Sequence, residues 1–441
     1  MMIGMIFQTL YNIADGIWVA GLGVNQLAAV GLFFPFLLII MALGGGIGIG
    51  GSSAISRYIG AKNKKGADNT AIHTILLGLI IALSITLPLL PFLEKIFISL
   101  SGNKKVGKMA ADYARILFGG AFVLMFSNIA NAVLRGEGDA RRAMIALVVG
   151  SLLNMFLDPL YIYTFKMGIK GAAWATLTSM IVSAALFVWW IFIKKDTYLD
   201  ITFSDFSFSP SILKEILKVG IPASIAQLSM SISMFFLNLV TIKAGGAEGV
   251  AIFTSGWRIV TIGIIPLLGM ATAVTSVTGA AFGARDKKKL QTAYFYAIKI
   301  GILIETCIAV AIFLFAPQVS FLFTYSEATK RISERLVEFL RWMALFFPTI
   351  PLGMLTGAMF QGIGKGARAL VVTIFRTILL QVPIAYLLSV TLKMGLVGIW
   401  LGIIGGNLVA VLFAFTWGKI TIEKMETKFG NILPFPHPSG K

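Results

Sequence analysis

The chain has 441 residues, of which 57% are hydrophobic and only 13% charged. A soluble globular protein carries about 25% charged residues, so this composition excludes an ordinary soluble domain and favours an integral membrane protein. The net charge of +18 is compatible with nucleic-acid binding. The basic residues, however, lie in short connections between apolar segments, so we expect no nucleic-acid partner. Cys307 is the only cysteine, which excludes a disulfide within the chain and any Cys/His cluster for a structural metal.

Twelve apolar segments follow one another along the chain, and each can cross a bilayer, for which a helix needs about 20 residues. We expect the first segment to act as the insertion signal, because the N-terminus lacks the basic start and the small-residue cleavage site of a signal peptide. The predicted membrane helices cover residues 1–20, 27–55, 68–92, 109–134, 143–165, 171–193, 218–242, 250–280, 292–316, 337–360, 369–391 and 395–418.

The second segment contains the glycine-rich run Gly44–Gly51. It resembles a phosphate-binding loop only superficially, because it lies within an apolar run and lacks the Lys-Ser/Thr ending. Small residues in a membrane helix let a neighbouring backbone come close. The run therefore predicts close helix packing.

Basic residues alternate between loops, as the positive-inside rule requires. The loops near 57–65, 135–142, 194–218, 285–289 and 365–368 are basic, and we place them inside together with both termini. The opposite loops carry a smaller number of basic residues, namely Lys104, Lys105, Lys108, Lys330 and Arg331. We therefore predict a multi-pass protein of the cell (inner or plasma) membrane with cytoplasmic termini.

The second half of the sequence repeats the first, most clearly in its loops. Ile59–Lys65 aligns with Phe282–Lys288 at an offset of 223 residues, and Met167–Gly171 aligns with Met394–Gly398 at an offset of 227. Six helices in each half give both copies the same topology. We therefore predict an all-α fold of twelve transmembrane helices in two six-helix lobes, related by a pseudo-two-fold axis along the membrane normal.

The predicted domains are an N-lobe at 1–192, a cytoplasmic interlobe linker at 193–217, and a C-lobe at 218–441 that ends in a short cytoplasmic tail. The seventh helix opens with a proline, Pro222, whose counterpart at the offset of 223 would precede Met1. Our hypothesis is that the first helix lacks its opening residues.

Two acidic residues, Asp15 and Asp158, lie inside apolar segments of the first half without a neighbouring Lys or Arg. An ionisable group at bilayer depth costs roughly 2.5–3.5 kcal/mol on insertion scales, so such residues are candidates for function. Asn154 and Asp158 are four residues apart and share a helix face. Pro159 leaves the carbonyl of Met155 without its donor. These oxygens suit a hard cation or a proton site; the alternative is an Asp-Pro bend lined by water.

With Asp15 and the segment Asn154–Pro159 the chain resembles the multidrug and toxic compound extrusion (MATE) family, and more narrowly its DinF-like branch. The resemblance covers essentially the whole chain. The matching motifs are Leu10–Trp18, Gly21–Gly23, Leu27–Ala29, Leu134–Asp139, Asn154–Pro159 and Gly171–Thr176. It implies two lobes around a central cavity, with alternating access driven by sodium or protons.

Carried over residue by residue, the resemblance implies a cation or proton site in the N-lobe, with Na⁺ as the bound metal if the protein is sodium-coupled. Its implied ligands are Asp15, Asn154, Asp158 and Thr176. The residues implied to line the cavity are Tyr11, Tyr113 and Asn131, the last two on the fourth helix. For both tyrosines the alternative is interfacial anchoring or ordinary packing. For Thr176 it is a hydroxyl bonded to its own helix.

Two features depart from patterns within the family. The NorM-like branch has acidic residues in the C-lobe, but none occurs in Val219–Val240 or Trp342–Phe360. The proline near the start of the first helix is absent, which removes the basis for a helix-bending mechanism. Arg258, Glu305 and Arg376 lie in apolar segments of the second half, where they either pair with one another or line the cavity. The alternative is a purely structural ion pair or a side chain that snorkels to the end of its span.

We therefore predict an antiporter that exports amphipathic, often cationic, organic compounds in exchange for Na⁺ or H⁺. It is expected to act as a monomer among membrane lipids and to need no cofactor. The alternative within the wider superfamily is a lipid-linked precursor flippase, which the acidic N-lobe disfavours. A membrane enzyme is disfavoured because no nucleophile–base pair or metal-ligand spacing is present. The sequence leaves open which ion is coupled.

Overall fold

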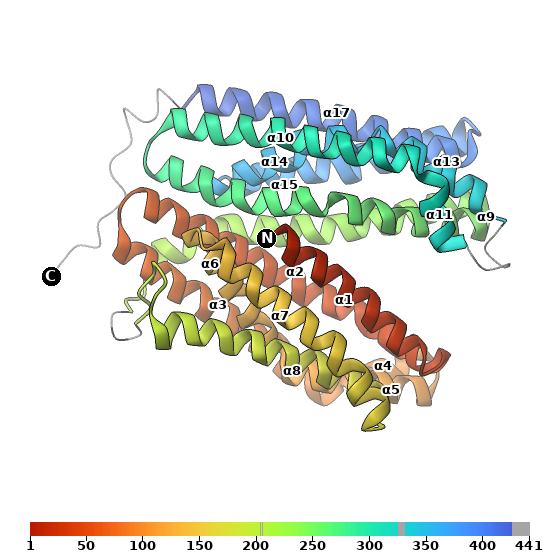
Figure 1. Cartoon of the computed structure of the whole chain (residues 1–441), viewed down its shortest axis with the longest axis horizontal. Coiled ribbons are helices and arrows are strands. Elements are labelled where there is room, and N and C mark those ends of the chain that lie inside the picture. The colour runs from red at the N-terminus through yellow and green to blue at the C-terminus, as the bar shows by residue number, and fades with distance from the viewer. Residues whose placement is uncertain (203, 205, 325–330, 426–441) are drawn as a thin grey trace. The chain divides into compact units, whose positions relative to one another are not determined.

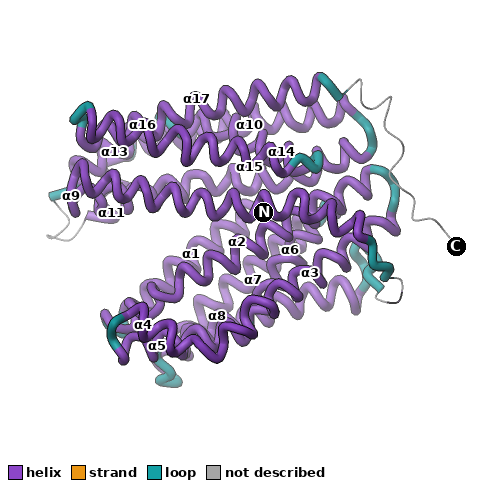
Figure 2. Tube along the Cα trace, turned by 180° about the vertical axis from the view of Figure 1, so that it is seen from behind, coloured by secondary structure: helices purple, strands orange, loops and turns teal. Residues whose placement is uncertain are grey.

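The computed structural model describes the whole chain except residues 203, 205, 325–330 and 426–441. Every regular element in the described part is a helix, and most connections are short (Figures 1 and 2). The chain divides into two compact units, Met1–Ser224 and Ile225–Lys441. The predicted cytoplasmic tail falls on residues 426–441 and so lies outside the described residues. The predicted domain boundaries stay predictions.

The first unit is a bundle in which α2 packs against α3 and α6, and α1 packs against α7. Two membrane helices end in a π-helical stretch, η2 after α7 and η3 after α8. The elements are α1 Met2–Ala20, α2 Val24–Gly60, α3 Lys64–Leu89, η1 Leu90–Phe92, α4 Leu93–Ser101, α5 Lys104–Gly119, α6 Ala121–Glu137, α7 Ala140–Pro159, η2 Leu160–Thr164, α8 Ile169–Val188, η3 Trp189–Lys194 and the first part of α9, which spans Pro210–Gly283.

The second unit contains the rest of α9 and the helices that follow it. In α9 two helices join at Gly246, whose backbone is left-handed with φ 61°. The remaining elements are α10 Lys287–Leu314, α11 Ala316–Thr324, α13 Ser333–Ala344, η5 Phe347–Thr349, α14 Ile350–Gly362, α15 Gly366–Ile374, η6 Phe375–Gln381, α16 Val382–Tyr386, η7 Leu387–Thr391 and α17 Gly395–Glu423.

Twelve membrane spans follow from these helices. Nine helical segments of the described chain are long and apolar enough to cross a bilayer, or ten if the bent pair α5–α6 is one span. Because α9 consists of two helices joined at Gly246, the number becomes eleven. The twelfth is α1, which has 19 residues and carries the polar side chains Gln8, Asn12 and Asp15. The predicted all-helical polytopic fold is confirmed.

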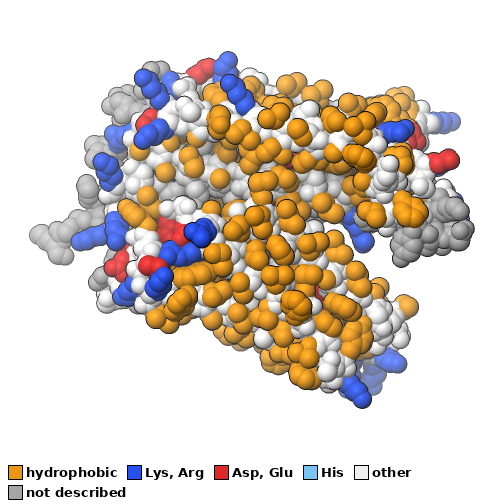
Figure 3. All heavy atoms as spheres, in the orientation of Figure 1, with side chains coloured by type: hydrophobic (Ala, Val, Ile, Leu, Met, Phe, Trp, Pro, Cys, Tyr) orange, Lys and Arg blue, Asp and Glu red, His pale blue; other side chains and the backbone are white. Residues whose placement is uncertain are grey.

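The surface of each unit has the pattern of a membrane protein. Hydrophobic side chains cover its middle, and charged side chains gather toward its ends (Figure 3). Large apolar side chains such as Phe156, Ile193 and Leu303 are exposed. An exposed apolar surface of this extent would favour association in water, whereas in a bilayer it meets lipid chains.

Glycines of α2 bring the start of α9 into backbone contact. A β-carbon at Gly50 would lie 2.3 Å from the carbonyl oxygen of Ile216, and one at Gly46 would lie 2.6 Å from that of Gly220. The close packing predicted for Gly44–Gly51 is confirmed. This contact holds the first turns of α9 in the first unit.

The connection between η3 and α9 is fixed to the first unit by polar contacts. Asn69 donates to the Ser207 carbonyl at 2.7 Å. The Arg142 guanidinium lies 2.7 Å from the Asp196 carboxylate. Lys194 also bonds Asp196 at 2.7 Å, and this bond holds the pKa of that carboxyl below its ordinary value. The segment 193–217 is therefore bound to α3 and α7 along part of its length.

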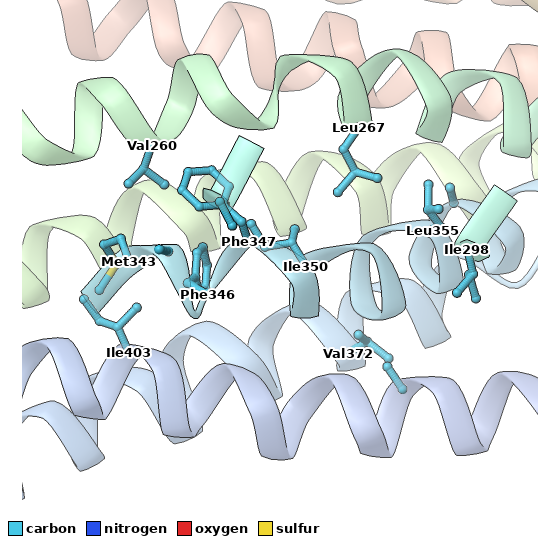
Figure 4. Packing of buried hydrophobic residues seen from close by; sticks show 14 of the residues in the cluster. Val260, Leu267, Ile298, Met343, Phe346, Phe347, Ile350, Leu355, Val372 and Ile403 are labelled. Carbon is cyan, nitrogen blue, oxygen red and sulfur yellow. The ribbon is translucent and has the colours of Figure 1, made fainter. Parts of the chain in front are cut away.

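The core of the second unit surrounds a broken span. Helix α13 ends at Ala344 and α14 begins at Ile350, with η5 between them. Pro348 within η5 lacks a backbone N–H and so interrupts the helical ladder. Phe347 packs here among buried side chains of α9, α10 and α17 (Figure 4). Asn407 of α17 donates to the Thr349 hydroxyl at 2.7 Å, which ties the break to α17.

Candidate cation site and polar cavity

The two predicted acidic site residues, Asp15 and Asp158, lie on adjacent helices of the first unit. Asp158 is in the last turn of α7 and is fully buried, and Asn154, one turn before it, is also buried. Asp15 is partly buried on α1, which packs along α7. The helix ladder at Asp158 gives way to the π-helical stretch η2 directly after Pro159.

The side-chain amide of Asn154 connects α7 to α8. Its nitrogen donates to Asp158 Oδ2 at 3.0 Å and its oxygen accepts from the Thr176 backbone N–H at 3.2 Å, in the amide orientation that satisfies both atoms. In the opposite orientation the amide nitrogen lies 3.4 Å from the Thr176 hydroxyl. The structure thus brings together Asn154, Asp158 and Thr176.

Unpartnered carboxylate oxygens remain at this place. The Oδ1 atoms of Asp15 and Asp158 are buried, and no described residue donates a hydrogen bond to them. A buried carboxylate oxygen without a donor is destabilised unless it gains a proton or a cation. The oxygen atoms present suit either.

A polar cavity of about 130 Å³ lies inside the first unit next to this cluster. Of the predicted site residues, Tyr11, Asn131 and Asn154 line the cavity, whereas Asp15, Asp158, Thr176 and Tyr113 do not. Further polar side chains from α1, α6, α7 and α8 line it, namely Gln8, Ser127, Asn128, Arg135, Ser151, Ser179 and Ser183.

The two residues predicted on the fourth helix lie on separate arms of a bent span. The span turns by 50° between α5 and α6, at Gly120. Tyr113 of α5 is buried and packs edge-on against Phe33 at 5.4 Å between ring centroids. Asn131 of α6 donates to the Ala143 carbonyl at 2.8 Å. The ring contact and the interhelical bond give both residues a packing role as well.

Arg135 is a cavity residue that the sequence argument missed. Its guanidinium donates to Asn131 Oδ1, and it lines the cavity wall. The signal was present, because Asn128, Asn131 and Arg135 are three and four residues apart and so occupy one face of α6. The positive-inside rule explains Arg135 as a loop charge, so the shared face is easily overlooked.

The three charged residues of the second half do not pair with one another. Among the described residues no ion pair joins Arg258, Glu305 or Arg376. Glu305 is fully buried on α10, and neither of its carboxylate oxygens bonds a described residue. The described part of the chain also contains no cluster of three or more His, Cys, Asp or Glu side chains able to hold a metal.

Twelve membrane spans and a polar cavity inside one of two units define a polytopic membrane transporter. A family model described as MatE matches residues 1–160 and 222–387. The chain belongs to the MatE family.

Relatives and solved structures agree with this assignment. The chain is 29% identical to the probable multidrug resistance protein YoeA of Bacillus subtilis, over 95% of this chain and 91% of the relative. It is 26% identical to the probable multidrug resistance protein NorM of Thermotoga maritima, over 90% and 86%. These relatives are named as multidrug resistance proteins, and the chain is a transporter and not an enzyme.

Two solved structures match nearly the whole fold. One is an outward-facing multidrug resistance MATE family transporter of the MOP superfamily, with 54% identity and a TM-score of 0.94 over 97% of this chain and 94% of that one. The other is a MOP superfamily transporter from Pyrococcus furiosus, with 54% identity and a TM-score of 0.92 over 96% and 94%. None of these matches identifies the DinF-like branch, which stays a prediction.

Proposed function

We propose that this protein is a cation-coupled antiporter that exports amphipathic, often cationic, organic compounds by alternating access. One observation carries the proposal. Asp15 and Asp158 lie on adjacent helices of the first unit, and each has a buried oxygen that no described residue bonds. Two such acids stabilise the fold poorly unless they are protonated or bind a cation.

The coupling cation is Na⁺ or H⁺. The carboxylates of Asp15 and Asp158, the amide oxygen of Asn154 and the hydroxyl of Thr176 are ligands that Na⁺ accepts, since hard cations take oxygen ligands. The same two carboxylates can share a proton. In either case the cation binds in the N-lobe.

The substrate is proposed to occupy the polar cavity. That the substrate is a small organic compound is inferred from the relatives, which are named as multidrug resistance proteins. Asn154 belongs to both places, since its amide lines the cavity and contacts Asp158. A cation bound at Asp158 would attract the Asn154 amide oxygen and so turn the amide, which changes the shape of the cavity wall. Substrate and cation then bind preferentially to different conformations of the protein. Exchange of one for the other requires this difference in affinity.

The proposed organisation follows the sequence analysis. The protein acts as a monomer in the cell membrane, with both termini in the cytoplasm, an N-lobe at 1–192, a linker at 193–217 and a C-lobe at 218–441. A lipid-linked precursor flippase is not favoured, because the relatives are named for multidrug resistance.

Gradient-driven efflux tests the coupling. The protein is reconstituted in liposomes loaded with ethidium, a planar lipophilic cation, and a sodium gradient and a pH gradient are imposed separately. We expect release under one of the two and a return to the rate of protein-free liposomes when that gradient is collapsed. Equal release with and without either gradient would contradict an antiporter and indicate passive permeation.

Two substitutions separate the effect of the Thr176 hydroxyl from the effect of the side-chain volume. In Thr176→Val the hydroxyl is lost, and we expect the concentration of the coupling cation that gives half-maximal efflux to rise about tenfold, the loss of one oxygen ligand worth about 1.4 kcal/mol. Thr176→Ser keeps the hydroxyl and serves as the control, with a half-saturation near that of the wild type. If both variants behave alike, the hydroxyl is not a ligand.

A further inference from the structure

A groove of about 670 Å³ lies in the second unit between α10 and α13. Its walls are mostly apolar, with Val310 and Phe313 from α10 and Leu345 just after α13. Hydrophobic side chains dominate the middle of this unit's surface and charged ones its ends (Figure 3). The groove also contains three charged side chains of α13, namely Glu334, Glu338 and Arg341.

These three charges form one row. They are four and three residues apart, so they lie on one face of α13. None of them forms an ion pair with another described residue. The Arg341 guanidinium lies over the ring of Phe313, 5.7 Å from its centroid. Both signs of charge are therefore presented to whatever fills the groove.

The sequence repeat identifies the residues of the first unit that are equivalent to this row. Pro91 aligns with Pro317 and Arg135 with Gln361, both at an offset of 226 residues. The same offset pairs Arg115 with Arg341, Asp112 with Glu338, and Glu94 with Ser320.

The arginine forms ion pairs in the first unit, whereas in the second unit it forms none with any residue that the structure describes. Arg115 is bonded to Glu94 at 3.0 Å and to Asp112 at 3.4 Å. In the second unit the position of Glu94 is taken by Ser320, which is buried and donates to the Ser333 carbonyl at 3.2 Å. Among the described residues Arg341 thus has no carboxylate partner on the neighbouring element, and its guanidinium can donate to an anionic group from outside the chain.

The row is also ordered by depth. Helix α13 opens the span Ser333–Gly362, so residue numbers increase from the membrane surface inward. At 1.5 Å per residue, Arg341 lies about 10 Å further along the helix than Glu334. Leu345 and Pro348 lie deeper still. From the surface inward the groove offers carboxylates, then a guanidinium, then an apolar wall.

We propose that this groove binds a phospholipid with a primary-amine headgroup, at the membrane face predicted to be outside. The phosphate accepts hydrogen bonds from Arg341, the ammonium donates to Glu338 and Glu334, and one acyl chain lies against Val310 and Leu345. An amphipathic organic cation matches the carboxylates alone and places a positive charge beside Arg341. The phospholipid complements all three charges in the order in which they occur.

Native mass spectrometry of the delipidated full chain tests this site. Phosphatidylethanolamine and phosphatidylglycerol with the same acyl chains are titrated separately. We expect one tight phosphatidylethanolamine site that weakens about tenfold in Arg341→Gln and in Glu338→Gln, the size of one charge-assisted hydrogen bond. Phosphatidylglycerol lacks the ammonium. It should bind the wild type more weakly, lose affinity in Arg341→Gln and lose none in Glu338→Gln.

A second variant and a matched control keep the result interpretable. Leu345→Trp fills the groove and leaves the three charges in place, so it should also remove the tight site. Arg115→Gln, at the equivalent position of the first unit, should bind phosphatidylethanolamine like the wild type. The proposal is overturned if Arg341→Gln and Arg115→Gln have equal effects, if the two lipids bind alike, or if ethidium displaces the phospholipid from the same site.

Discussion

Asp158→Asn is expected to reduce cation-driven efflux to the rate of protein-free liposomes while leaving the protein folded. The amide takes up no proton and carries no charge to balance a cation, yet it has nearly the same shape as the carboxyl. Since Asp158 does not line the cavity, substrate binding should persist. It should no longer weaken as the coupling cation is added, because the two equilibria are linked reciprocally. Efflux and equilibrium binding of ethidium measure the two effects.

Asp112→Asn provides the control for this substitution. Asp112 is an acid of the same unit, but it pairs with Arg115 and Lys170 at the surface. Surface ion pairs contribute about 0–1 kcal/mol, so transport should change little. Wild-type efflux in Asp158→Asn, with the cation still antagonising ethidium binding, would exclude Asp158 from the coupling site.

Gly50→Ala is expected to destabilise the first unit by about 1–3 kcal/mol or more, because the added methyl group overpacks a rigid contact. The new β-carbon would lie 2.3 Å from the carbonyl oxygen of Ile216, and a backbone oxygen yields less than the end of a flexible side chain. We expect a lower midpoint of thermal unfolding for the purified protein in detergent.

Gly31→Ala is the matched control on the same helix. No heavy atom lies within 4 Å of a β-carbon placed at Gly31. Alanine is favoured over glycine in a helix interior by about 0.5–1 kcal/mol, so this variant should be as stable as the wild type or more so. Equal midpoints for the two variants would mean that α2 and the start of α9 do not hold each other at Gly50.

The spans could be predicted from the sequence because a bilayer permits few solutions. A lipid-exposed backbone must satisfy its hydrogen bonds within the helix, so a long apolar run implies a spanning helix. The acids Asp15 and Asp158 stood out for the same reason, since charge at depth is rare. Both arguments use local sequence only.

Contacts between helices could not be predicted in the same way. The bond between the Asn154 amide and Thr176 depends on how α7 and α8 face each other, and 22 residues separate the two positions. The bend at Gly120 lies inside an apolar run, where the Gly119-Gly120 pair permits a bend but does not set its angle. An arginine near the end of a span can either set the orientation of the span or take part in a site. The sequence does not distinguish these two roles for Arg135.

The segment 193–217 shows a further limit of composition. Its polar character predicts a cytoplasmic linker between the lobes. The part from Pro210 onward belongs to α9 and includes Ile216, which is fully buried. Polar residues before it bind the first unit through Asn69 and Arg142. The polar residues of this segment suggest exposure to solvent, but several of them bond to other polar groups of the protein.

Two loops at equivalent positions of the repeat each contain a residue other than glycine with a positive φ. Lys62 follows α2 with φ 57°, and Arg285 follows α9 with φ 55°. At the end of a helix this left-handed position usually belongs to glycine, and a side chain there is disfavoured by roughly 1–2 kcal/mol. Both residues lie in basic loops that are predicted to be cytoplasmic. Lys166 after η2 and Lys393 after η7 form a second such pair, with φ 55° and 54°. The repeat therefore extends from the sequence of these loops to the conformation of individual backbone residues.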